Sequence, residues 1–303
     1  MSAADLFATV LDCNGRSLVL DRPRVVGILN VTPDSFSDGG LYADLEAAVA
    51  HGLAMVAQGA DMLDVGGEST RPGAADVSEQ DELARVLPVI EALAARTDKP
   101  ISIDTSKPAV MRAAVAAGAG MINDVYALRR EGALDAAAAL GVPVCIMHMQ
   151  GEPRGMQDDP RYDDVVGEVH RFLADRLFAC ELAGIDKRKV LVDPGFGFGK
   201  TLEHNLELLR DLQRFTDLGS GVYAGLSRKS MIGTITGRTA PAERAAGSVA
   251  AALIAVQQGA KLVRVHDVQA TVDALAVWHA VDANRPARRR EPAPSMPRWP
   301  DDE

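Results

Sequence analysis

Polar or charged side chains follow nearly every short apolar run in this 303-residue sequence, at the point where the run ends. In chain order they are Asn30, Glu68, Asp104, Asn123 with Asp124, His148, Asp193, Ser227 with Arg228 and Lys229, and Arg264 with His266 and Asp267. Strand ends meet water and are often polar, which would explain one or two of these positions but not the whole series. The pattern therefore predicts one composite site built from many strand ends.

One subset of these residues suits a flat, nitrogen-rich ring. Asp104, Asn123 and Asp193 offer carboxylate and amide groups that can pair with ring N–H and amino donors lying beside a carbonyl acceptor. Purines and pterins present such an edge. Lys229 can serve this half of the site or the other half, and a structural ion pair with an aspartate is its alternative role.

A second subset suits a phosphorylated group. Arg264 and His266 supply N–H donors for phosphate oxygens, and Asn30 can also offer its carbonyl oxygen to a hard cation such as Mg²⁺. These residues predict a ligand that carries a phosphorylated leaving group.

His148 is expected to be a wall or supporting residue and not a catalytic base.

The segment 27–40, GILNVTPDSFSDGG, joins a buried strand to a polar loop. Asn30 ends the apolar run, a Thr-Pro-Asp sequence stops regular structure, and two glycines close the loop. Burying this loop would leave its many oxygens without partners, so we expect it to be mobile and to cover the site.

Two further loops follow strand ends. Segment 67–77, GESTRPGAADV, contains turn residues and one long cation, Arg71. Segment 194–200, PGFGFGK, sets Phe196 and Phe198 between glycines, an unusual place for core aromatics, and Phe198 could stack on a flat ligand. This glycine-rich segment lacks the strand-turn-helix pattern of a nucleotide-binding loop.

The elements that must position these residues alternate along the chain. Strands are expected at 25–30, 62–65, 101–104, 121–125, 144–147, 190–193, 221–225 and 262–266, and helices at 44–58, 78–95, 108–117, 132–140, 163–183, 203–214, 241–258 and 268–282. Successive strand-helix units predict a closed (β/α)₈ barrel, an α/β fold of the TIM-barrel type, with a doubly wound sheet as the alternative.

Both ends of the chain lie outside these units. Two short apolar segments flank Asn14-Gly15, a dipeptide suited to a tight turn, and predict an N-terminal β-hairpin at about 9–20 that covers one end of the fold. Residues 285–303 are rich in Pro, Arg and acidic side chains without periodicity, so a disordered tail is expected. Residues 1–284 are expected to form a single domain.

The composition narrows the class of partner. A formal net charge of −10 argues against a general nucleic-acid or membrane surface, so small molecules are the expected partners. Cys13, Cys145 and Cys180 lack metal-ligand spacing, which fits a reducing cytosol. The N-terminus shows no export signal and no apolar run is long enough to span a bilayer, so a cytoplasmic protein is expected.

The loops and strand ends together form a family signature. GILNVTPDSFSDGG, DVGGESTRPGAADVS, SIDTSKP, IND, MHMQG, VDPGFGFGK, GLSRKSMIG and RVHDV occur in this order, and the chain resembles the bacterial dihydropteroate synthase family over about residues 24–280. The resemblance implies a (β/α)₈ barrel that condenses 6-hydroxymethyl-7,8-dihydropterin pyrophosphate with p-aminobenzoate, giving 7,8-dihydropteroate and pyrophosphate in folate synthesis. It also implies a homodimer through the later helices and binding of sulfonamide inhibitors.

The same resemblance implies roles for individual residues. The pterin-pocket positions are matched by Asp104, Asn123, Met147, Asp193, Gly225 and Lys229. The pyrophosphate site is matched by Asn30, Arg264 and His266, with Asn30 also binding Mg²⁺. The p-aminobenzoate site is matched by Phe36, Thr70, Arg71, Pro72, Phe198, Lys229 and Ser230. Asp38 matches a loop acid near the reacting carbon, and the expected catalytic residues are Asn30, Asp38, Lys229, Arg264 and His266.

Chemistry and resemblance agree on a dissociative, SN1-like reaction. A pyrophosphate whose charge is matched by Mg²⁺, Arg264 and His266 leaves more easily, and the dihydropterin can delocalise the positive charge left behind. The weakly nucleophilic aniline nitrogen then attacks a cation, so no strong base is required. The alternatives are a pterin-binding module that presents a methylated folate to a corrinoid partner, and an inactive paralogue. The SFSDGG, TRPG, SRKS and RVHD motifs favour the synthase.

Overall fold

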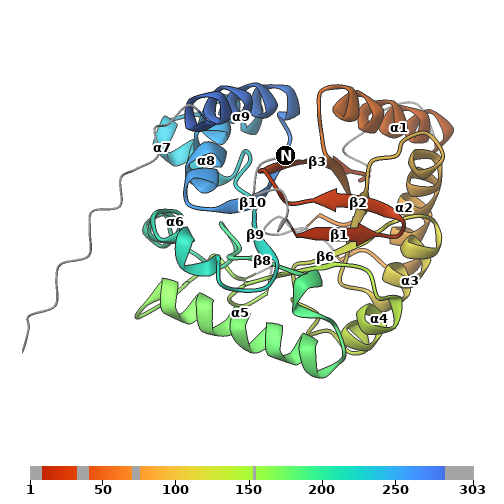
Figure 1. Ribbon diagram of the computed structural model, residues 1–303, viewed down its shortest axis with the longest axis horizontal. Helices are drawn as coiled ribbons and strands as arrows, with labels where there is room; N and C mark the ends of the chain where they lie inside the picture. The colour runs from red at the N-terminus through yellow and green to blue at the C-terminus, as the bar shows by residue number, and fades with distance from the viewer. Residues whose placement is uncertain (1–8, 33–40, 70–75, 153–154, 284–303) are drawn as a thin grey trace, which may run out of the picture.

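Parallel strands form a closed barrel at the centre of the molecule (Figure 1). The computed structural model describes residues 9–32, 41–69, 76–152 and 155–283. The barrel strands are β3 (Arg24–Asn30), β4 (Met62–Gly66), β5 (Ile101–Asp104), β6 (Met121–Asp124), β7 (Val144–Met147), β8 (Val190–Asp193), β9 (Gly221–Ala224) and β10 (Ala260–Val265). Their order is β10-β3-β4-β5-β6-β7-β8-β9, which confirms the predicted (β/α)₈ barrel.

Helices form a ring outside the strands (Figure 1). They are α1 (Leu41–Ala57), α2 (Glu79–Ala94), α3 (Pro108–Ala116), α4 (Ala133–Leu140), α5 (Val165–Leu182), α6 (Leu202–Arg210), α7 (Ser230–Thr236), α8 (Ala245–Gln257) and α9 (Val268–Ala283), with 3₁₀ turns η3 (Lys187–Lys189), η4 (Leu212–Phe215) and η5 (Pro241–Arg244). Of these, α7 was not predicted, because its sequence SMIGTIT is rich in β-branched residues and glycine, which are weak helix formers.

Side-chain caps start several helices directly after the strand-end loops. The Ser78 side chain accepts a hydrogen bond from the Asp81 amide at the start of α2, and the Asp164 side chain does the same for Gly167 at the start of α5. Thr201 and His204 form a reciprocal capping box at the start of α6. Each cap satisfies amide groups that would otherwise lack partners, and so fixes where a loop ends.

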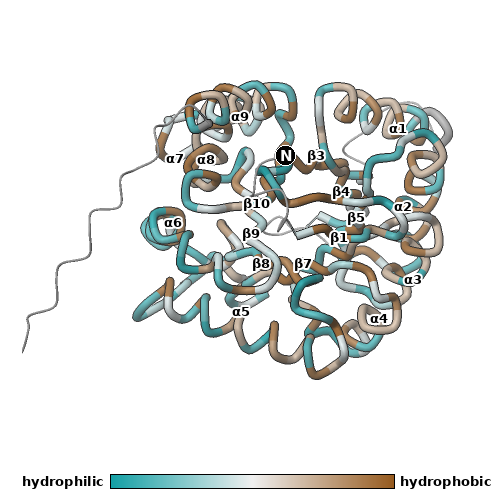
Figure 2. The backbone as a smooth tube through the Cα atoms, viewed as in Figure 1, coloured by the Kyte–Doolittle hydropathy of each residue, from teal (hydrophilic) through white to brown (hydrophobic). Residues whose placement is uncertain are grey.

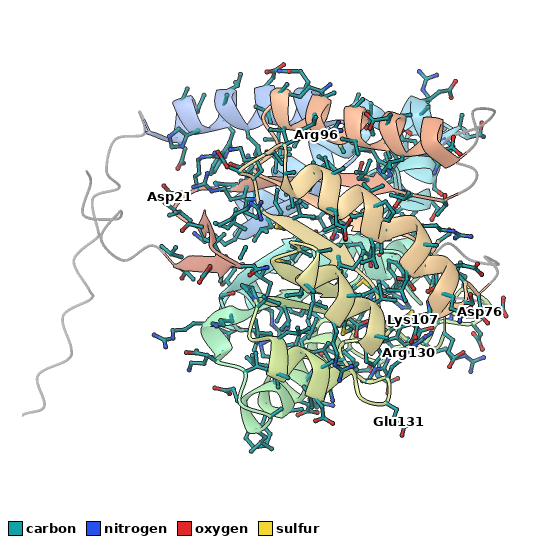
Figure 3. All side chains as sticks on the ribbon, turned by 90° about the vertical axis from the view of Figure 1, so that its right-hand side faces the viewer. Asp21, Asp76, Arg96, Lys107, Arg130 and Glu131 are labelled. Carbon is teal, nitrogen blue, oxygen red and sulfur yellow. The ribbon has the colours of Figure 1, made fainter. Side chains whose placement is uncertain are left out.

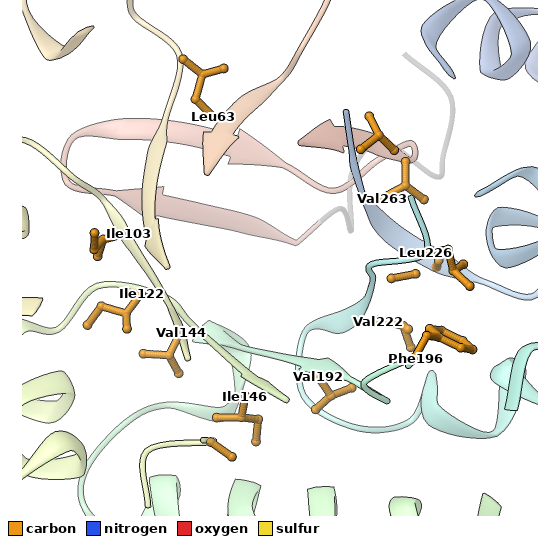
Figure 4. Close-up of a cluster of buried hydrophobic side chains, with 14 of the residues drawn as sticks. Leu63, Ile103, Ile122, Val144, Ile146, Val192, Phe196, Val222, Leu226 and Val263 are labelled. Carbon is orange, nitrogen blue, oxygen red and sulfur yellow. The ribbon is translucent and has the colours of Figure 1, made fainter. Parts of the chain in front are cut away.

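The main hydrophobic core lies between strands and helices. Leu63, Ile103, Ile122, Val144 and Val192 are fully buried in it, and Figure 4 shows them around the barrel wall. Figure 2 shows the same division along the chain, with apolar strands inside and hydrophilic stretches on the outer helices. Because side chains alternate along a strand, the neighbours of these core residues lie on the barrel's inner face.

The N-terminal hairpin, β1 (Val10–Cys13) and β2 (Arg16–Val19), closes one end of the barrel, as predicted. A second buried cluster joins hairpin residues to strand residues: Leu11, Cys13, Leu18, Leu20, Val26, Met62, Met121, Cys145, Leu191, Tyr223 and Leu262. Asn14 and Gly15 adopt positive φ angles of 56° and 82°, the tight turn that the sequence indicates.

Because the hairpin covers the amino ends of the strands, the accessible end of the barrel is the one formed by their carboxyl ends. Figure 3 shows the hairpin and Asp21 at one end of the molecule and Lys107 and Asp76 toward the other. Within the described ranges, no helix is both long and apolar enough to cross a membrane. The three cysteines are buried and free of disulfides.

Candidate active site

A network of charged side chains crosses the barrel interior. Arg264 on β10 donates from Nε to Asp64 Oδ2 at 2.6 Å and from Nη2 to Asp104 Oδ2 at 2.8 Å. Burial alone would lower the pKa of Arg264, but the two carboxylates together raise it above its ordinary value. The structure therefore joins Arg264, predicted for the phosphate half, to Asp104, predicted for the ring half.

Asp64 is the principal site residue that sequence reasoning missed. It is fully buried in β4 and also accepts hydrogen bonds from Ser102 Oγ at 2.5 Å and Asn123 Nδ2 at 3.1 Å. Its position inside the strand MLDVG concealed it, because only strand ends were considered as site positions. The available signal was an acidic residue in an otherwise apolar strand, since a buried charge requires a partner.

Three oxygen atoms of the predicted ring-binding residues remain without protein donors. They are Asp104 Oδ1, Asn123 Oδ1 and Asp193 Oδ2, and we call them the acceptor set. Within the described part of the chain none receives a hydrogen bond, and none belongs to the fully enclosed atoms. Because an amide oxygen and the oxygens of ionised carboxylates only accept, the site is suited to a ligand edge that presents several N–H donors.

Burial shifts the pKa values of the aspartates in this set. Burial raises the pKa of Asp104 to about 7, with Arg264 opposing the shift and the Asp64 carboxylate adding to it. Burial also raises the pKa of Asp193, with Lys229 and the Gly195 amide opposing it. Both carboxylates are therefore short of compensating charge in the unliganded protein.

Lys229 lies where the two predicted ligand sites should meet. It is the N-cap residue of α7, its Nζ donates to the Phe196 carbonyl oxygen, and the same atom lies 4.7 Å from the centre of the Phe198 ring. Burial lowers the pKa of Lys229 to about 8, with Asp193 opposing the shift. The structure thus brings together Lys229, Phe198 and Asp193, as predicted, and Ser230 follows as the first residue of α7.

Gly225 lies close to these groups. A Cβ built on it would lie 3.6 Å from Asp193 Oδ2 and 3.8 Å from Lys229 Nζ, which are ordinary contacts. Gly225 therefore lies beside both a carboxylate and an ammonium group, and its predicted role as a wall of the pterin pocket stays a prediction. Met147, the other predicted wall residue, is buried in a cluster with Val125 and Met149 against which Phe198 packs.

Gly225→Ala is expected to weaken pterin binding by about tenfold or more without changing stability by more than about 0.5 kcal/mol. The added methyl makes only ordinary contacts in the unliganded protein but would enter the space predicted for the ring. Calorimetric titration with 6-hydroxymethyl-7,8-dihydropterin and thermal unfolding of the same samples measure the two effects. Unchanged affinity would show that the ring does not lie against Gly225.

The loop 194–200 is held by a buried lysine. Lys200 Nζ donates to the Gly195 and Phe198 carbonyl oxygens at 2.9 and 3.0 Å and lies 2.9 Å from His148 Nδ1. Gly195 is at φ +71°, and a Cβ there would lie 1.8 Å from the His148 carbonyl oxygen. Only glycine fits that position.

His148 contacts the lysine that holds this loop. Burial, followed by the charge of Lys200, lowers the pKa of His148 to about 2, so the ring stays neutral. Its contact with Lys200 agrees with the predicted supporting role. Phe196, in contrast, is fully buried in the main core, so the expectation that neither aromatic of this loop is a core residue was wrong for Phe196.

The predicted phosphate residues lie on neighbouring strands. Ser227 Oγ accepts from the His266 amide at 3.1 Å and lies 3.0 Å from His266 Nδ1. Asn30 ends β3, and the Asn30 side chain makes no hydrogen bond with another described residue. A Cβ on Gly66 would lie 3.8 Å from Asn30 Oδ1 and 3.7 Å from Asp104 Oδ2, so Asn30 and Asp104 flank that glycine.

Several polar strand-end residues have local structural roles, so the expectation that the whole series forms one site was too broad. Glu68 pairs with Lys107 at 2.5 Å, and Asp124 accepts from the Tyr126 and Leu128 amides. Arg228 makes a two-point ion pair with Asp267 at 2.6 and 3.0 Å. These contacts hold the loops that surround the site.

Some predicted site residues lie outside the described residues. They are Phe36, Asp38, Thr70, Arg71 and Pro72, together with the predicted tail 285–303. Their predicted roles stay predictions.

Comparison with known proteins gives consistent matches. The family model described as pterin binding enzyme matches residues 26–266. The chain is 53% identical to dihydropteroate synthase from Escherichia coli (strain K12) over 281 residues, covering 93% of this chain and 99% of the relative. It is similar to the structure of Xanthomonas albilineans dihydropteroate synthase with 4-aminobenzoic acid (TM-score 0.88, 64% identity, 92% and 100% of the two chains). The structure of that organism's enzyme with 7,8-dihydropteroate gives a TM-score of 0.84 at 62% identity over 91% and 100%.

Proposed function

The chain belongs to the pterin-binding enzyme family and, within it, to the dihydropteroate synthases, and we propose that it condenses 6-hydroxymethyl-7,8-dihydropterin pyrophosphate with p-aminobenzoate. The observation that supports this most directly is the acceptor set of Asp104, Asn123 and Asp193 at the open end of the barrel. A pterin ring presents ring N–H and amino groups along one edge, and these are the donors that the three oxygens require.

Lys229 and Phe198 mark the direction in which the second substrate would lie. The Lys229 ammonium group is beside Asp193 on one side and over the Phe198 ring on the other. In this proposal p-aminobenzoate binds along Phe198 and Ser230, with its amine directed toward the exocyclic carbon of the pterin. The predicted contributions of Phe36, Thr70, Arg71, Pro72 and Asp38 complete that side.

The chain's own residues would bind and orient the pyrophosphate. Arg264 has Nη1 left after its bonds to Asp64 and Asp104, and in this proposal His266 contacts the same phosphate oxygens. Stabilising negative charge on the leaving group lowers the barrier to its departure. In this proposal His148, held by Lys200, is not a base for the amine, which is a weak nucleophile that attacks a cationic pterin carbon.

We also propose Mg²⁺ as a cofactor. No group of three or more His, Cys, Asp or Glu side chains in the described ranges could hold a metal ion. Mg²⁺, however, usually keeps several waters and binds through one or two protein oxygens together with substrate phosphates. The Asn30 side chain, without a described hydrogen-bond partner, fits that limited role. When bound, Mg²⁺ would neutralise charge on the pyrophosphate.

The direct test is pyrophosphate release from the dihydropterin substrate with and without p-aminobenzoate, with product identified by mass. We expect release that depends on p-aminobenzoate and yields 7,8-dihydropteroate. A pterin-binding module that serves a corrinoid partner would bind the ring without making this product, and an inactive paralogue would release no pyrophosphate. Sulfonamides are expected to compete with p-aminobenzoate in the same assay.

Binding of 6-hydroxymethyl-7,8-dihydropterin is expected to release protons and to weaken as the pH falls below about 7. The pKa of Asp104 is about 7 in the unliganded protein, and N–H donors favour its ionised form. Below pH 7 the ligand must displace a proton, so affinity should fall by up to about tenfold per pH unit. Calorimetry in buffers of different ionisation enthalpy measures the released protons. Asp104→Asn is the control and should reduce the release, whereas equal release from both proteins would contradict the assignment.

We further propose a cytoplasmic homodimer that uses the later helices. Exposed apolar side chains on α7, α8 and α9 support this, namely Ile235, Ile254, Val277 and Val281. Two small residues of α8, Gly247 and Ala251, pack within the chain: a Cβ on Gly247 would lie 2.5 Å from Ile232 Cγ2, and Ala251 is buried. Sedimentation at several concentrations would test the dimer.

A further inference from the structure

Asp64 lies beneath the acceptor set and cannot itself reach a ligand. Its side chain is fully buried, and both oxygens are occupied. Oδ1 accepts from Ser102 Oγ at 2.5 Å, whereas Oδ2 accepts from Asn123 Nδ2 at 3.1 Å and Arg264 Nε at 2.6 Å. Two residues assigned to substrate binding are therefore held from below by one carboxylate.

The contact with Asp64 determines which end of the Asn123 amide is available to a ligand. An ionised carboxylate only accepts hydrogen bonds, so the Asn123 NH₂ group must face Asp64. The oxygen Oδ1 is then the atom left at the site, where it has no described donor. Without Asp64 the amide could turn over and present NH₂ instead, because its two ends are nearly equal in size.

The same carboxylate fixes the plane of Arg264. The guanidinium is a rigid planar group, and Asp64 on β4 and Asp104 on β5 hold two of its three nitrogens. With only one carboxylate the group could rotate about that single contact. Asp64 thus limits Arg264 to one orientation as well.

We propose that Asp64 is a positioning residue that sets the hydrogen-bonding polarity of the pterin site, by fixing Asn123 as an acceptor and Arg264 in one plane. The consequence is selection of a ring edge that presents donors to Asn123. This inference rests on the proposed function, which supplies the pterin ring. Asp64 acts through Asn123 and Arg264 and makes no contact with substrate.

A double-mutant cycle tests whether Asp64 acts through Asn123. Calorimetry with 6-hydroxymethyl-7,8-dihydropterin should show that Asp64→Ala raises Kd about 10- to 100-fold and Asn123→Ala by a similar factor. The Kd of the double variant should be at most about three times the larger of the two single-variant Kd values. Both changes remove the same interaction, so their effects should not multiply. If the two effects multiply, Asp64 does not act through Asn123 and the inference fails.

Asp64→Asn separates hydrogen bonding from charge. Its amide oxygen can take the place of Oδ2 and accept from both Asn123 and Arg264, while its NH₂ donates to Ser102 Oγ. We expect affinity within about threefold of wild type, together with a shift of the binding pH profile to lower pH because the Asp64 charge no longer raises the Asp104 pKa. A loss as large as that of Asp64→Ala would mean that charge alone matters and would overturn the proposal.

Asp61→Ala is the matched control for loss of a buried carboxylate. Asp61 is also nearly buried and pairs with two arginines, Arg22 at 2.6 Å and Arg24 at 3.0 Å, but it precedes β4 at the hairpin end. Its loss should destabilise the fold and leave Kd within about twofold. An equal rise in Kd would attribute the effect of Asp64→Ala to general loosening of the barrel.

Two further measurements keep the result interpretable. Asp64→Leu, which fills the volume without offering an acceptor, takes the place of Asp64→Ala in the cycle if the alanine variant does not fold. Wild-type pyrophosphate release is measured first. Its absence would refute the proposed function, whereas an active wild type with a multiplicative cycle would refute only the role of Asp64.

Discussion

Lys229→Ala is expected to lower kcat/KM for the condensation by at least about 100-fold while the barrel stays folded. The Lys229 ammonium group lies between Asp193 and the Phe198 ring, where both substrates are proposed to meet. Each charge-assisted hydrogen bond lost there should cost about 1.5–3 kcal/mol, and about 1.4 kcal/mol corresponds to tenfold in rate. Steady-state pyrophosphate release, with each substrate varied in turn, measures the effect.

The pH dependence provides a second measurement on the same variant. Because the pKa of Lys229 is about 8 in the unliganded protein, wild-type kcat/KM should fall as the pH rises above about 8. The alanine variant should lack this decrease. If the decrease persists in the variant, another group is responsible for it.

Lys189→Ala is a suitable control for Lys229→Ala. Lys189 also donates to a backbone carbonyl oxygen, that of Gly141 at 2.7 Å, but it lies on η3 at the protein surface. The control should keep wild-type kinetics and a similar melting temperature. A Lys229→Ala protein with a normal rate and a normal KM for p-aminobenzoate would remove Lys229 from the site.

The barrel could be predicted from sequence because each of its signals is local. Buried parallel strands appear as short runs of Val, Ile and Leu, and the intervening helices show apolar residues at helical spacing. The predicted strand 101–104 agrees with β5 at both ends. The α7 helix was missed because tertiary packing of Met231 and Ile232 overrides the weak helix propensity of its sequence.

The pairing inside the site could not be predicted in the same way. Arg264 is 200 residues from Asp64 and 160 from Asp104, and their contact exists only because β10, β4 and β5 surround the same space. Sequence pattern placed Arg264 with phosphate binders because arginine suits phosphate. The structure shows that two buried carboxylates already hold two of its nitrogens.

The glycine-rich loop shows a similar limit. From sequence, Phe196 and Phe198 are equivalent positions between glycines. In the fold, Phe196 enters the main core and Phe198 lies beneath Lys229. The division is made by the left-handed glycines and by the bonds of Lys200 to Gly195 and Phe198, none of which a hydropathy pattern contains.

Arg264→Ala is expected to destabilise the protein by about 3–5 kcal/mol at pH 8, the largest loss of stability among the changes considered. Removal of the guanidinium leaves Asp64 fully buried without a charged partner and Asp104 beside it. Chemical denaturation of variant and wild type at pH 8 and pH 5 measures the difference. Arg22→Ala is the control and should cost about 1 kcal/mol or less, because Arg22 is half exposed and Asp61 keeps Arg24.

The pH dependence of that loss has a definite sign. Without Arg264 the pKa of Asp104 should rise further above the unfolded value of about 4. A group whose pKa is raised on folding favours the folded state most below its unfolded pKa, and this contribution is lost as the pH rises through the folded pKa. The difference between variant and wild type should therefore be largest at pH 8 and shrink toward pH 5.

Adding Asp64→Asn to Arg264→Ala separates lost packing from unpaired charge. The double variant no longer buries the Asp64 charge, so it should recover a substantial part of the stability that Arg264→Ala loses, and its pH dependence should be weaker. The same double variant should still bind pterin poorly, because Arg264 is absent. If stability does not recover, the cost of Arg264→Ala comes from the lost packing of the arginine side chain. In that case the guanidinium shared by Asp64 and Asp104 is not needed to keep these carboxylates ionised inside the barrel.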